Sequence, residues 1–316
     1  MTAYILRRLV MLIPVLLIVG TVVFALVHLT PGDPAAVMAG QSATPEQIEQ
    51  IRKQLGLDRP FLEQFVDWFG GLFRLDFGES IFLGMSVTDA IKERAQPTML
   101  LTLYALIVQI AIGVPAGVIA AVRRNSVLDR ILMVLSISGA AIPTFFLGIL
   151  LILFFAVNRR WLPSGGYVPI QDDPVEHFKS MLMPAFALGF SSAGLLARMV
   201  RSTMLDVLRE DYVRTAFSKG IAERQVIVRH ALRNALIPAI TVIGASMGAL
   251  LGGAVVTEFV FTIPGMGRLV VQSISRRDFP VIQGAVMVIA AIYVLVNLLI
   301  DILYVYIDPR VRYGGS

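Results

Sequence analysis

Residues 99–122 read MLLTLYALIVQIAIGVPAGVIAAV, and none of these side chains is charged. A helix of this length is about 36 Å long, enough to cross the ~30 Å hydrocarbon core of a bilayer. Further apolar runs that could span a membrane occupy residues 9–29, 131–157, 181–200, 237–257 and 281–303. Of the 316 residues, 56% are hydrophobic and 16% are charged, unlike a soluble domain. The sequence therefore predicts an all-α membrane protein with six transmembrane helices.

The first apolar run could be mistaken for a cleaved signal peptide. It lacks a clear small-x-small cleavage site, and similar segments follow it, so we interpret it as a permanent span. The chain contains no cysteine, which excludes disulfides, thiolate metal sites and cysteine nucleophiles.

The distribution of basic residues predicts the orientation. If the N-terminus is cytoplasmic, the inner segments carry fifteen Lys and Arg and the two short outer loops carry six. This excess favours cytoplasmic N- and C-termini, and it explains the net charge of +5 without nucleic-acid binding. The predicted organisation is an N-terminus with the first span (1–29), an extracytoplasmic segment (30–97) and a five-span core (98–316) that includes a cytoplasmic loop (198–236).

The extracytoplasmic segment is predicted to be partly helical. Thr44 and Gln47 match an N-cap and its capping-box partner, and Gly56 matches a stop, so we expect a helix over 45–55. The stretch FLEQFVDWFGGLF (61–73) can place large side chains on one face, namely Phe61, Leu62, Phe65, Trp68 and Phe69. This second helix could lie at the membrane interface or belong to a small packed subdomain, and the two interpretations are compatible.

Polar groups are scarce inside the predicted spans. The span cores contain no Asp, Glu, Lys or Arg; the charged residues near span ends, Arg198, Glu258 and Asp301, are interpreted as interfacial. Because transporters driven by proton or sodium gradients usually carry ionisable residues at membrane depth, a secondary transporter is disfavoured. Gln109 and Asn297 could hydrogen-bond across helices or face a wet route.

Catalytic motifs are also missing from the sequence. There is no GxxxxGK[ST] phosphate loop and no HExxH zinc helix, and GFSSAG (189–194) is not the GxSxG of a nucleophilic serine. The histidines, His28, His177 and His230, are predicted outside the membrane core. We therefore predict no catalytic residue and no metal site, and we disfavour an intramembrane enzyme.

Small residues recur at helical spacing in two spans. The fifth span has Gly244, Gly248 and Gly252 at i, i+4 and i+8, with Ala245 beside them. The second span repeats the spacing at Gly113 and Gly117. Such faces let helices approach closely, and those of the fifth span could pack a helix or border a translocation pathway.

The cytoplasmic loop contains the stretch DYVRTAFSKG (211–220). Asp211 can cap a helix over 212–218 and Gly220 can end it, and a second helix is expected over 222–238.

The first of these loop helices has an amphipathic surface. Tyr212, Val213 and Phe217 stand beside basic residues, a mixture that a purely solvated loop does not need. The helix could dock on another protein or lie against lipid headgroups.

Together with HALRNALIP (230–238), DYVRTAFSKG resembles the cytoplasmic EAA-type loop of binding-protein-dependent ABC importer permeases of the dipeptide/oligopeptide type. Motifs that also resemble this family follow in order along nearly the whole chain: ILRRL (5–9), PGDP (31–34), LGLDRP (55–60), DFGES (76–80), RSTMLDVL (201–208), FTIPGMGRL (261–269) and DPRVRY (308–313). The general family motif begins with Glu where this chain has Arg214, and its Leu-Ile-Pro close comes later here. Both departures agree with the peptide-type subgroup.

The resemblance implies a multi-pass subunit of the cell inner membrane without a cofactor of its own. Its partners would be a second homologous permease, two cytoplasmic ATP-binding subunits that use ATP and Mg, and an extracytoplasmic solute-binding protein. The implied ATPase-docking segment comprises Asp211, Tyr212, Arg214, Thr215, Ala216, Lys219 and Gly220. Peptides are the implied cargo, with glutathione or nickel chelates as alternatives. A membrane scaffold that binds partners through the same loop, without substrate flux, remains a further alternative.

Overall fold

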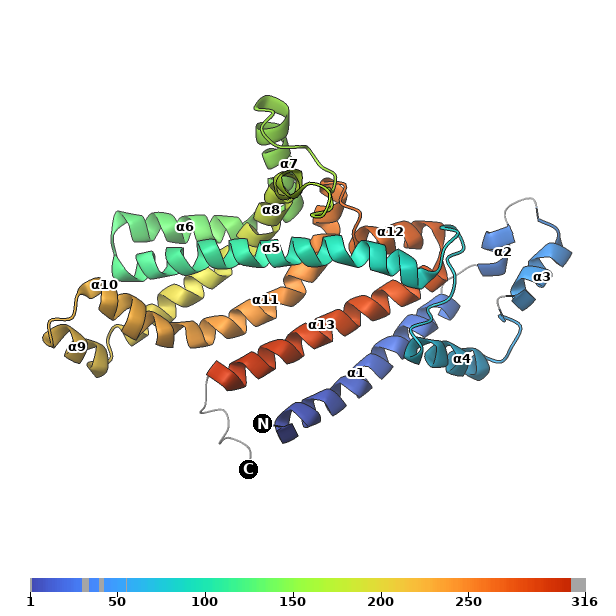
Figure 1. Ribbon diagram of the computed structural model, residues 1–316, viewed down its shortest axis with the longest axis horizontal. Coiled ribbons are helices and arrows are strands. Elements are labelled where there is room, and N and C mark those ends of the chain that lie inside the picture. Colours follow the sequence, from blue (N-terminus) through green and yellow to red (C-terminus); the bar gives the residue numbers. More distant parts are fainter. Residues whose placement is uncertain (1, 30–33, 40–42, 55, 308–316) are drawn as a thin grey trace. The chain divides into compact units, whose positions relative to one another are not determined.

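A computed structural model describes residues 2–29, 34–39, 43–54 and 56–307, and within these ranges the chain forms helices and no strands (Figure 1). The motif DPRVRY and all but the last residue of PGDP lie outside the described residues, as do both ends of the chain. The all-α prediction is confirmed. The chain packs as two compact units, residues 1–96 with 265–294 and residues 97–264 with 295–316. The division by topology stays a prediction.

Several helices are long and apolar enough to cross a membrane. They are α5 (Val87–Val122), α8 (Pro174–Val207), the continuous α10, η2 and α11 (Glu223–Val260) and most of α13 (Phe279–Ile307). Within α1 (Thr2–Leu29), a shorter apolar stretch is described at Val10–Ala25. These helices confirm a multi-span membrane protein, while the count of six spans stays a prediction.

The predicted third span is broken rather than continuous. Helix α6 (Val127–Ala141) meets α7 (Thr144–Leu151), which continues as the π-helical η1 (Ile152–Asn158), at an angle of 105°. Pro143 lies between the two helices and disfavours the helical conformation at the residue before it, which is extended with ψ of 123°. The expectation of one continuous helix is wrong for this reason.

The first unit includes α2 (Pro34–Ala39), α3 (Pro45–Gln54), α4 (Phe61–Phe73) and α12 (Met266–Arg276). Helix α3 begins with the predicted capping box, since the Thr44 N–H donates to Gln47 Oε1 at 2.9 Å and the Gln47 N–H donates to Thr44 Oγ1 at 3.4 Å. Gly56 follows the helix with φ of +66°, as its predicted stop requires.

Helix α4 forms over the predicted residues and packs by its aromatic side chains. The rings of Phe61, Phe65 and Trp68 lie 5.2, 5.3 and 5.6 Å from the buried Phe24 ring of α1. Leu62, by contrast, is 72% exposed and does not share the buried face. The packing supports the small-subdomain interpretation, and a position at the membrane interface stays a prediction.

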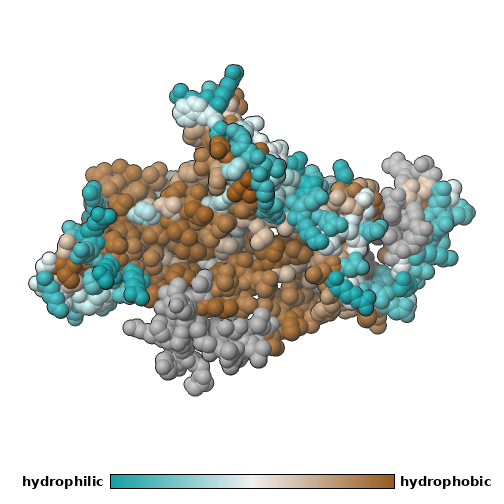
Figure 2. Space-filling model, viewed as in Figure 1, coloured by the Kyte–Doolittle hydropathy of each residue, from teal (hydrophilic) through white to brown (hydrophobic). Residues whose placement is uncertain are grey.

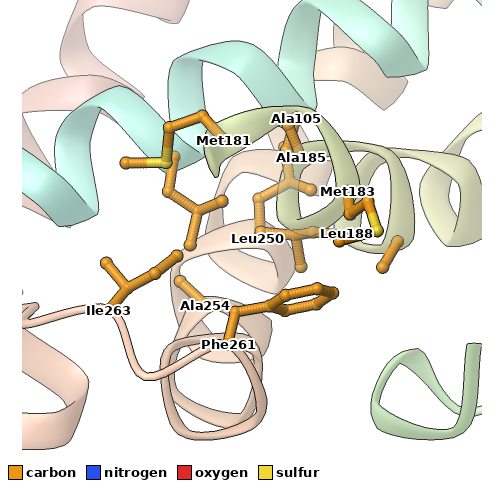
Figure 3. Packing of buried hydrophobic residues seen from close by; sticks show 11 residues of the cluster. Ala105, Met181, Met183, Ala185, Leu188, Leu250, Ala254, Phe261 and Ile263 are labelled. Carbon is orange, nitrogen blue, oxygen red and sulfur yellow. The ribbon is translucent and has the colours of Figure 1, made fainter. Parts of the chain in front are cut away.

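The second unit is organised around α8. This helix packs against α6, α7 and α11, and 67% of its apolar window is buried, compared with 28–33% for the other long apolar helices. Its main core, shown in Figure 3, joins α8 to α5, α11 and the loop after α11 through Leu101, Ala105, Met181, Met183, Ala185, Ala187, Leu188, Leu250, Ala254, Phe261 and Ile263. The remaining long helices therefore keep most of their apolar surface for lipid or for other chains.

The glycine pair of α5 packs closely, as predicted. A Cβ atom at Gly117 would lie 2.6 Å from the carbonyl oxygen of Ala197 and 2.7 Å from Cβ of Val200, both on α8. Gly113 meets α8 one turn away in the same manner. Only glycine lets the two backbones come this near.

Candidate functional site

The DYVRTAFSKG stretch forms the short helix α9 (Asp211–Ser218), which follows α8 in the second unit (Figure 1). Val213 and Ala216 lie on one face at i and i+3 and are buried. They pack with buried Val226 of η2 (Val226–Ala231) and with the surrounding Val207, Leu208 and Ile221. The apolar side of α9 is therefore anchored to the ends of neighbouring helices.

Helix α9 ends at its C-terminus as predicted, but its N-terminus differs from the prediction. Glu210 is the N-cap and Asp211 is the first helical residue, so the prediction that Asp211 caps the helix is wrong by one position. The Asp211 carboxylate is 97% exposed and lies 3.6 Å from Nη1 of Arg214. At the other end, Gly220 has φ of +74° and the Ile221 N–H donates back to Ala216, which confirms the predicted stop.

Tyr212 ties α9 to α11 (Leu232–Val260). Its hydroxyl accepts a hydrogen bond from Nδ2 of Asn234 at 2.7 Å and lies 3.5 Å from the carbonyl oxygen of His230. The sequence did not predict that Tyr212 and Asn234 form a hydrogen bond, because the two residues lie 22 positions apart. The only signal was that Asn234 belongs to the HALRNALIP motif.

The outward face of α9 combines aromatic and basic groups. Tyr212 and Phe217 are 42% and 44% exposed, and Arg214, Thr215, Lys219 and Gly220 are exposed as well. Figure 2 shows this end of the second unit as largely hydrophilic, with hydrophobic atoms among the polar ones. Of the predicted docking residues, Ala216 alone points into the packed side. Its part is to position the helix, while the others lie at the surface.

The helix after α9 differs from the predicted one. A single turn, α10 (Glu223–Gln225), runs through η2 into α11 without interruption, so the segment does not end near Pro238 as expected. Pro238 is accommodated inside α11. Because the helix is continuous, the residues that hold α9 belong to the same rigid element as the fifth span.

Two further contacts join the helices near α9. Thr203 Oγ1 of α8 donates to the carbonyl oxygen of Ala235 on α11 at 3.0 Å. Arg201 of α8 binds both carboxylate oxygens of Asp129 on α6, through Nε at 2.7 Å and Nη2 at 2.8 Å. The partners are 32 and 72 residues apart, so no local pattern indicated either pair. Together they join α8 to α11 and α6 close to the helix that follows α8.

The small residues of α11 do not share one packed face. A Cβ at Gly244 would lie 2.6 Å from Cγ2 of Ile300, so this glycine packs against α13. Ala245 and Gly252 are exposed, and a Cβ at Gly252 would meet no heavy atom within 4 Å among the described residues. Gly248 is half-buried. Gly244 is therefore a packing residue, whereas Ala245 and Gly252 are exposed.

Gln109 makes a bond across helices. Its Oε1 accepts from Ser246 Oγ of α11 at 3.0 Å, which favours the first of the two interpretations left open for it. Its Nε2 is buried and has no hydrogen-bond partner in the described part of the chain.

Glu258, predicted to lie at the membrane interface, is covered by the protein itself, while its depth in the membrane stays a prediction. It lies inside α11, is completely buried, and accepts a 2.5 Å hydrogen bond from Thr98 Oγ1. Because α11 continues to Val260, Glu258 lies within the helix and is covered within the second unit.

His177 is also buried. One ring nitrogen, Nδ1, lies 2.6 Å from the Val168 carbonyl oxygen, and Nε2 lies 3.1 Å from the Tyr104 hydroxyl. Burial raises the pKa of the neighbouring Tyr167. Among the described residues, no three His, Cys, Asp or Glu side chains gather where a metal ion could bind.

Comparisons with known proteins identify the class to which this multi-span helical chain belongs, that of transport permease subunits. The chain belongs to the family of binding-protein-dependent transport system inner membrane components, whose model matches residues 113–313. The model for the N-terminal part of such membrane components matches residues 1–99. The recognition of an ABC importer permease from the sequence is thus confirmed.

Relatives of this chain match over its whole length. A Brucella abortus (strain 2308) protein, provisionally named a peptide transport system permease protein, is 46% identical over 99% of this chain and 100% of its own. The glutathione transport system permease protein GsiC of Escherichia coli (strain K12) is 43% identical, with the same coverage. A chain from inward-facing structures of the MetNI methionine ABC transporter matches with a TM-score of 0.57 and 17% identity, over 69% of this chain and 96% of its own. That last likeness shows the shared fold.

Proposed function

We propose that this chain is a permease subunit of an ATP-driven importer of peptides in the inner membrane, with both termini in the cytoplasm. The carrying observation is the full-length 46% identity to a relative named for peptide transport. Glutathione, which the 43% identical relative is named for, is the second candidate cargo. Selectivity would reside mainly in the solute-binding protein, because the span cores carry few polar groups that could select a substrate.

In the proposed assembly, the chain pairs with a second homologous permease and receives cargo from an extracytoplasmic binding protein. Two cytoplasmic subunits bind and hydrolyse ATP with Mg. The chain itself supplies no phosphate-binding loop, so its contribution is mechanical.

Helix α9 would be the mechanical contact with an ATPase. Its exposed Arg214 and Phe217 suit a groove that accepts an amphipathic helix, and its buried Val213 stays with the permease. Motion of the ATPase would pass through the Val213 packing and the Tyr212–Asn234 hydrogen bond into α11. A rigid-body movement of this kind can switch a pathway between inward-facing and outward-facing states.

The exposed small residues of α11 would border the pathway. Ala245 and Gly252 have room beside them in the isolated chain, whereas Gly244 is occupied by packing on Ile300. The pathway would therefore run along the side of α11 that carries Ala245 and Gly252, where the second permease can complete it.

A cross-linking experiment tests the docking of α9. The chain has no native cysteine, and Phe217 is exposed whereas Ala216 is buried, so Phe217→Cys is the proper probe. In native membranes with the complete transporter, we expect an adduct with the ATPase whose yield changes when ATP and vanadate are added. Val134→Cys, exposed on apolar α6, is the matched control and should give no such adduct. An intact Phe217→Cys protein without an ATPase adduct would contradict the docking role.

The cargo is tested separately with the reconstituted transporter and its binding protein. We expect ATP-dependent uptake of a labelled di- or oligopeptide that exceeds uptake of labelled glutathione. The reverse order would replace the peptide assignment by the glutathione one.

A further inference from the structure

We propose that the α5–α6 turn and the adjoining part of α8 bind the phosphate headgroup of an acidic phospholipid. A cavity of about 470 Å³ lies here within the second unit, lined by Asn125, Asp129, Arg130, Met133 and Arg201. A glycerophosphate headgroup is smaller than this volume. Its polar lining is unusual for a chain whose spans are otherwise so apolar.

The acidic group of the cavity is already neutralised by the protein. The Asp129 side chain is 5% exposed, and both of its carboxylate oxygens accept hydrogen bonds from Arg201. The backbone N–H of Asn125 also donates to Oδ2 at 3.0 Å. The two Arg201–Asp129 bonds use Nε and Nη2, which leaves the Nη1 group available as a donor, and the Arg201 side chain is 26% exposed. The carboxylate thus fixes Arg201 in place without repelling an incoming anion.

Further positive charge surrounds the opening. Arg130 lines the cavity and is exposed, and Arg123 and Arg124 precede Asn125 in the same turn and are exposed too. Arg130 and Arg201 thus line the cavity, and two more exposed arginines stand in the turn next to it in the chain. Arginine binds phosphate oxygens through paired donors, so this charge pattern suits a phosphate-bearing anion.

Helix α6, which carries three of the lining residues, also has an exposed apolar stripe that suits an anion with acyl chains. Val127, Ile131 and Val134 recur at i, i+4 and i+7 on α6 and are 67, 50 and 61% exposed. Figure 2 shows hydrophobic surface along α6, with hydrophilic residues at its end. A free phosphate would use only the basic cavity, whereas a phospholipid uses the cavity and the apolar stripe together. Basic pockets between spans are known to suit acidic lipid headgroups.

Native mass spectrometry of the full-length chain, released from detergent, tests the proposal. We expect retention of added phosphatidylglycerol in preference to phosphatidylcholine. Arg130→Gln should weaken phosphatidylglycerol retention about fivefold, the electrostatic effect of one basic side chain at an anionic lipid. Arg224→Gln removes another exposed arginine of the same unit, which does not line the cavity, and should change retention little.

Several results would overturn the proposal. Equal losses for Arg130→Gln and Arg224→Gln would mean a diffuse surface effect, and equal retention of both lipids would mean that no anion is selected. Inorganic phosphate that binds the wild-type chain and displaces phosphatidylglycerol would make the ligand a soluble phosphate. The same measurement on the complete transporter should still show the lipid; its loss there would mean that a partner subunit covers α6. None of these outcomes depends on cargo or on ATPase docking.

Discussion

The hydroxyl of Ser80 donates a 2.5 Å hydrogen bond to Oδ2 of Asp278, a residue 198 positions further along the chain. Both residues are buried in the first unit. The backbone N–H groups of Ile81 and Phe82 also point to this carboxylate, at 3.3 and 3.4 Å. Asp278 precedes α13, so one acidic side chain fastens the loop after DFGES to the turn between α12 and α13.

Replacing Asp278 by alanine should destabilise the first unit by about 1–3 kcal/mol, because the Ser80 hydroxyl and the Ile81 N–H lose their acceptor and the Phe82 N–H keeps only its 3.3 Å contact with Ser80 Oγ. Asp278→Asn keeps one acceptor oxygen and should cost less. Thermal unfolding of the purified chain, followed by tryptophan fluorescence, measures both. Chymotrypsin should also cut faster at Phe82 in the alanine variant.

Ser80→Ala is the control for this prediction. It removes the hydroxyl that donates to Asp278 and accepts from the Leu83 N–H at 2.9 Å and the Phe82 N–H at 3.3 Å, but it leaves the carboxylate with its two backbone N–H contacts. It should therefore cost about 1–2 kcal/mol, less than the loss of the carboxylate. A larger loss for Ser80→Ala than for Asp278→Ala would contradict the central role of the carboxylate.

The Ser80–Asp278 pair could not be predicted from the sequence, because its members lie 198 positions apart. The α3 cap at Thr44 and the α9 stop at Gly220 were predicted correctly, because each depends on residues within one turn of the helix end. The buried position of Glu258 was missed, because it depends on a residue 160 positions away. Hydropathy predicted the apolar run around Pro143, but the direction of the chain after that proline depends on tertiary packing.

The same limit applies to the candidate site. The pattern of α9 predicted an amphipathic helix, and Tyr212, Arg214 and Phe217 lie at its surface, whereas Val213 and Ala216 face inward. Which helices hold α9 could not be predicted, since Asn234 and Val226 belong to an element whose start was placed correctly but whose end was not. The local pattern of apolar and basic residues identifies the exposed face of α9, but the helices that α9 contacts are determined by long-range packing.

Gly117→Leu should destabilise the second unit, whereas Gly252→Ala should not. A side chain at Gly117 would overlap the α8 backbone, and overpacking of this kind costs about 1–3 kcal/mol or more. Gly252 has open space, and alanine is the better helix former by about 1 kcal/mol. Melting temperatures of the two purified variants provide the measurement. In a transport assay, reduced uptake by a stable Gly252→Ala protein would support a place beside the pathway.

Ala216→Glu and Phe217→Ala should impair coupling by different routes. A carboxylate at the buried position 216 has no partner there, so α9 should be displaced and become accessible to protease. Phe217 is 44% exposed, so its truncation should leave α9 folded and weaken only the contact with the ATPase. Limited proteolysis separates the two cases, and ATPase activity of the complete transporter reports coupling. If Phe217→Ala exposed α9 to protease as strongly as Ala216→Glu, the outward assignment of Phe217 would be wrong.

The Asp129–Arg201 pair should show strong energetic coupling that resists salt. Asp129 is 5% exposed and bound through two parallel hydrogen bonds, so removing its charge leaves Arg201 partly buried without its partner. We expect Asp129→Asn and Arg201→Gln each to cost about 1–3 kcal/mol, reduced from the fully buried limit by the exposure of Arg201. The double variant should cost clearly less than the sum of the two single costs, because each single change leaves a charge without its partner and the double change removes both charges.

The surface pair Arg52–Glu49, with side chains 38 and 48% exposed, is the matched reference and should couple by no more than about 0.5 kcal/mol. At 1 M salt the reference coupling should vanish while that of Asp129 and Arg201 persists. Additive costs at this pair would show that α6 and α8 are held together by their apolar packing alone, and that Arg201 is free to turn toward other anions.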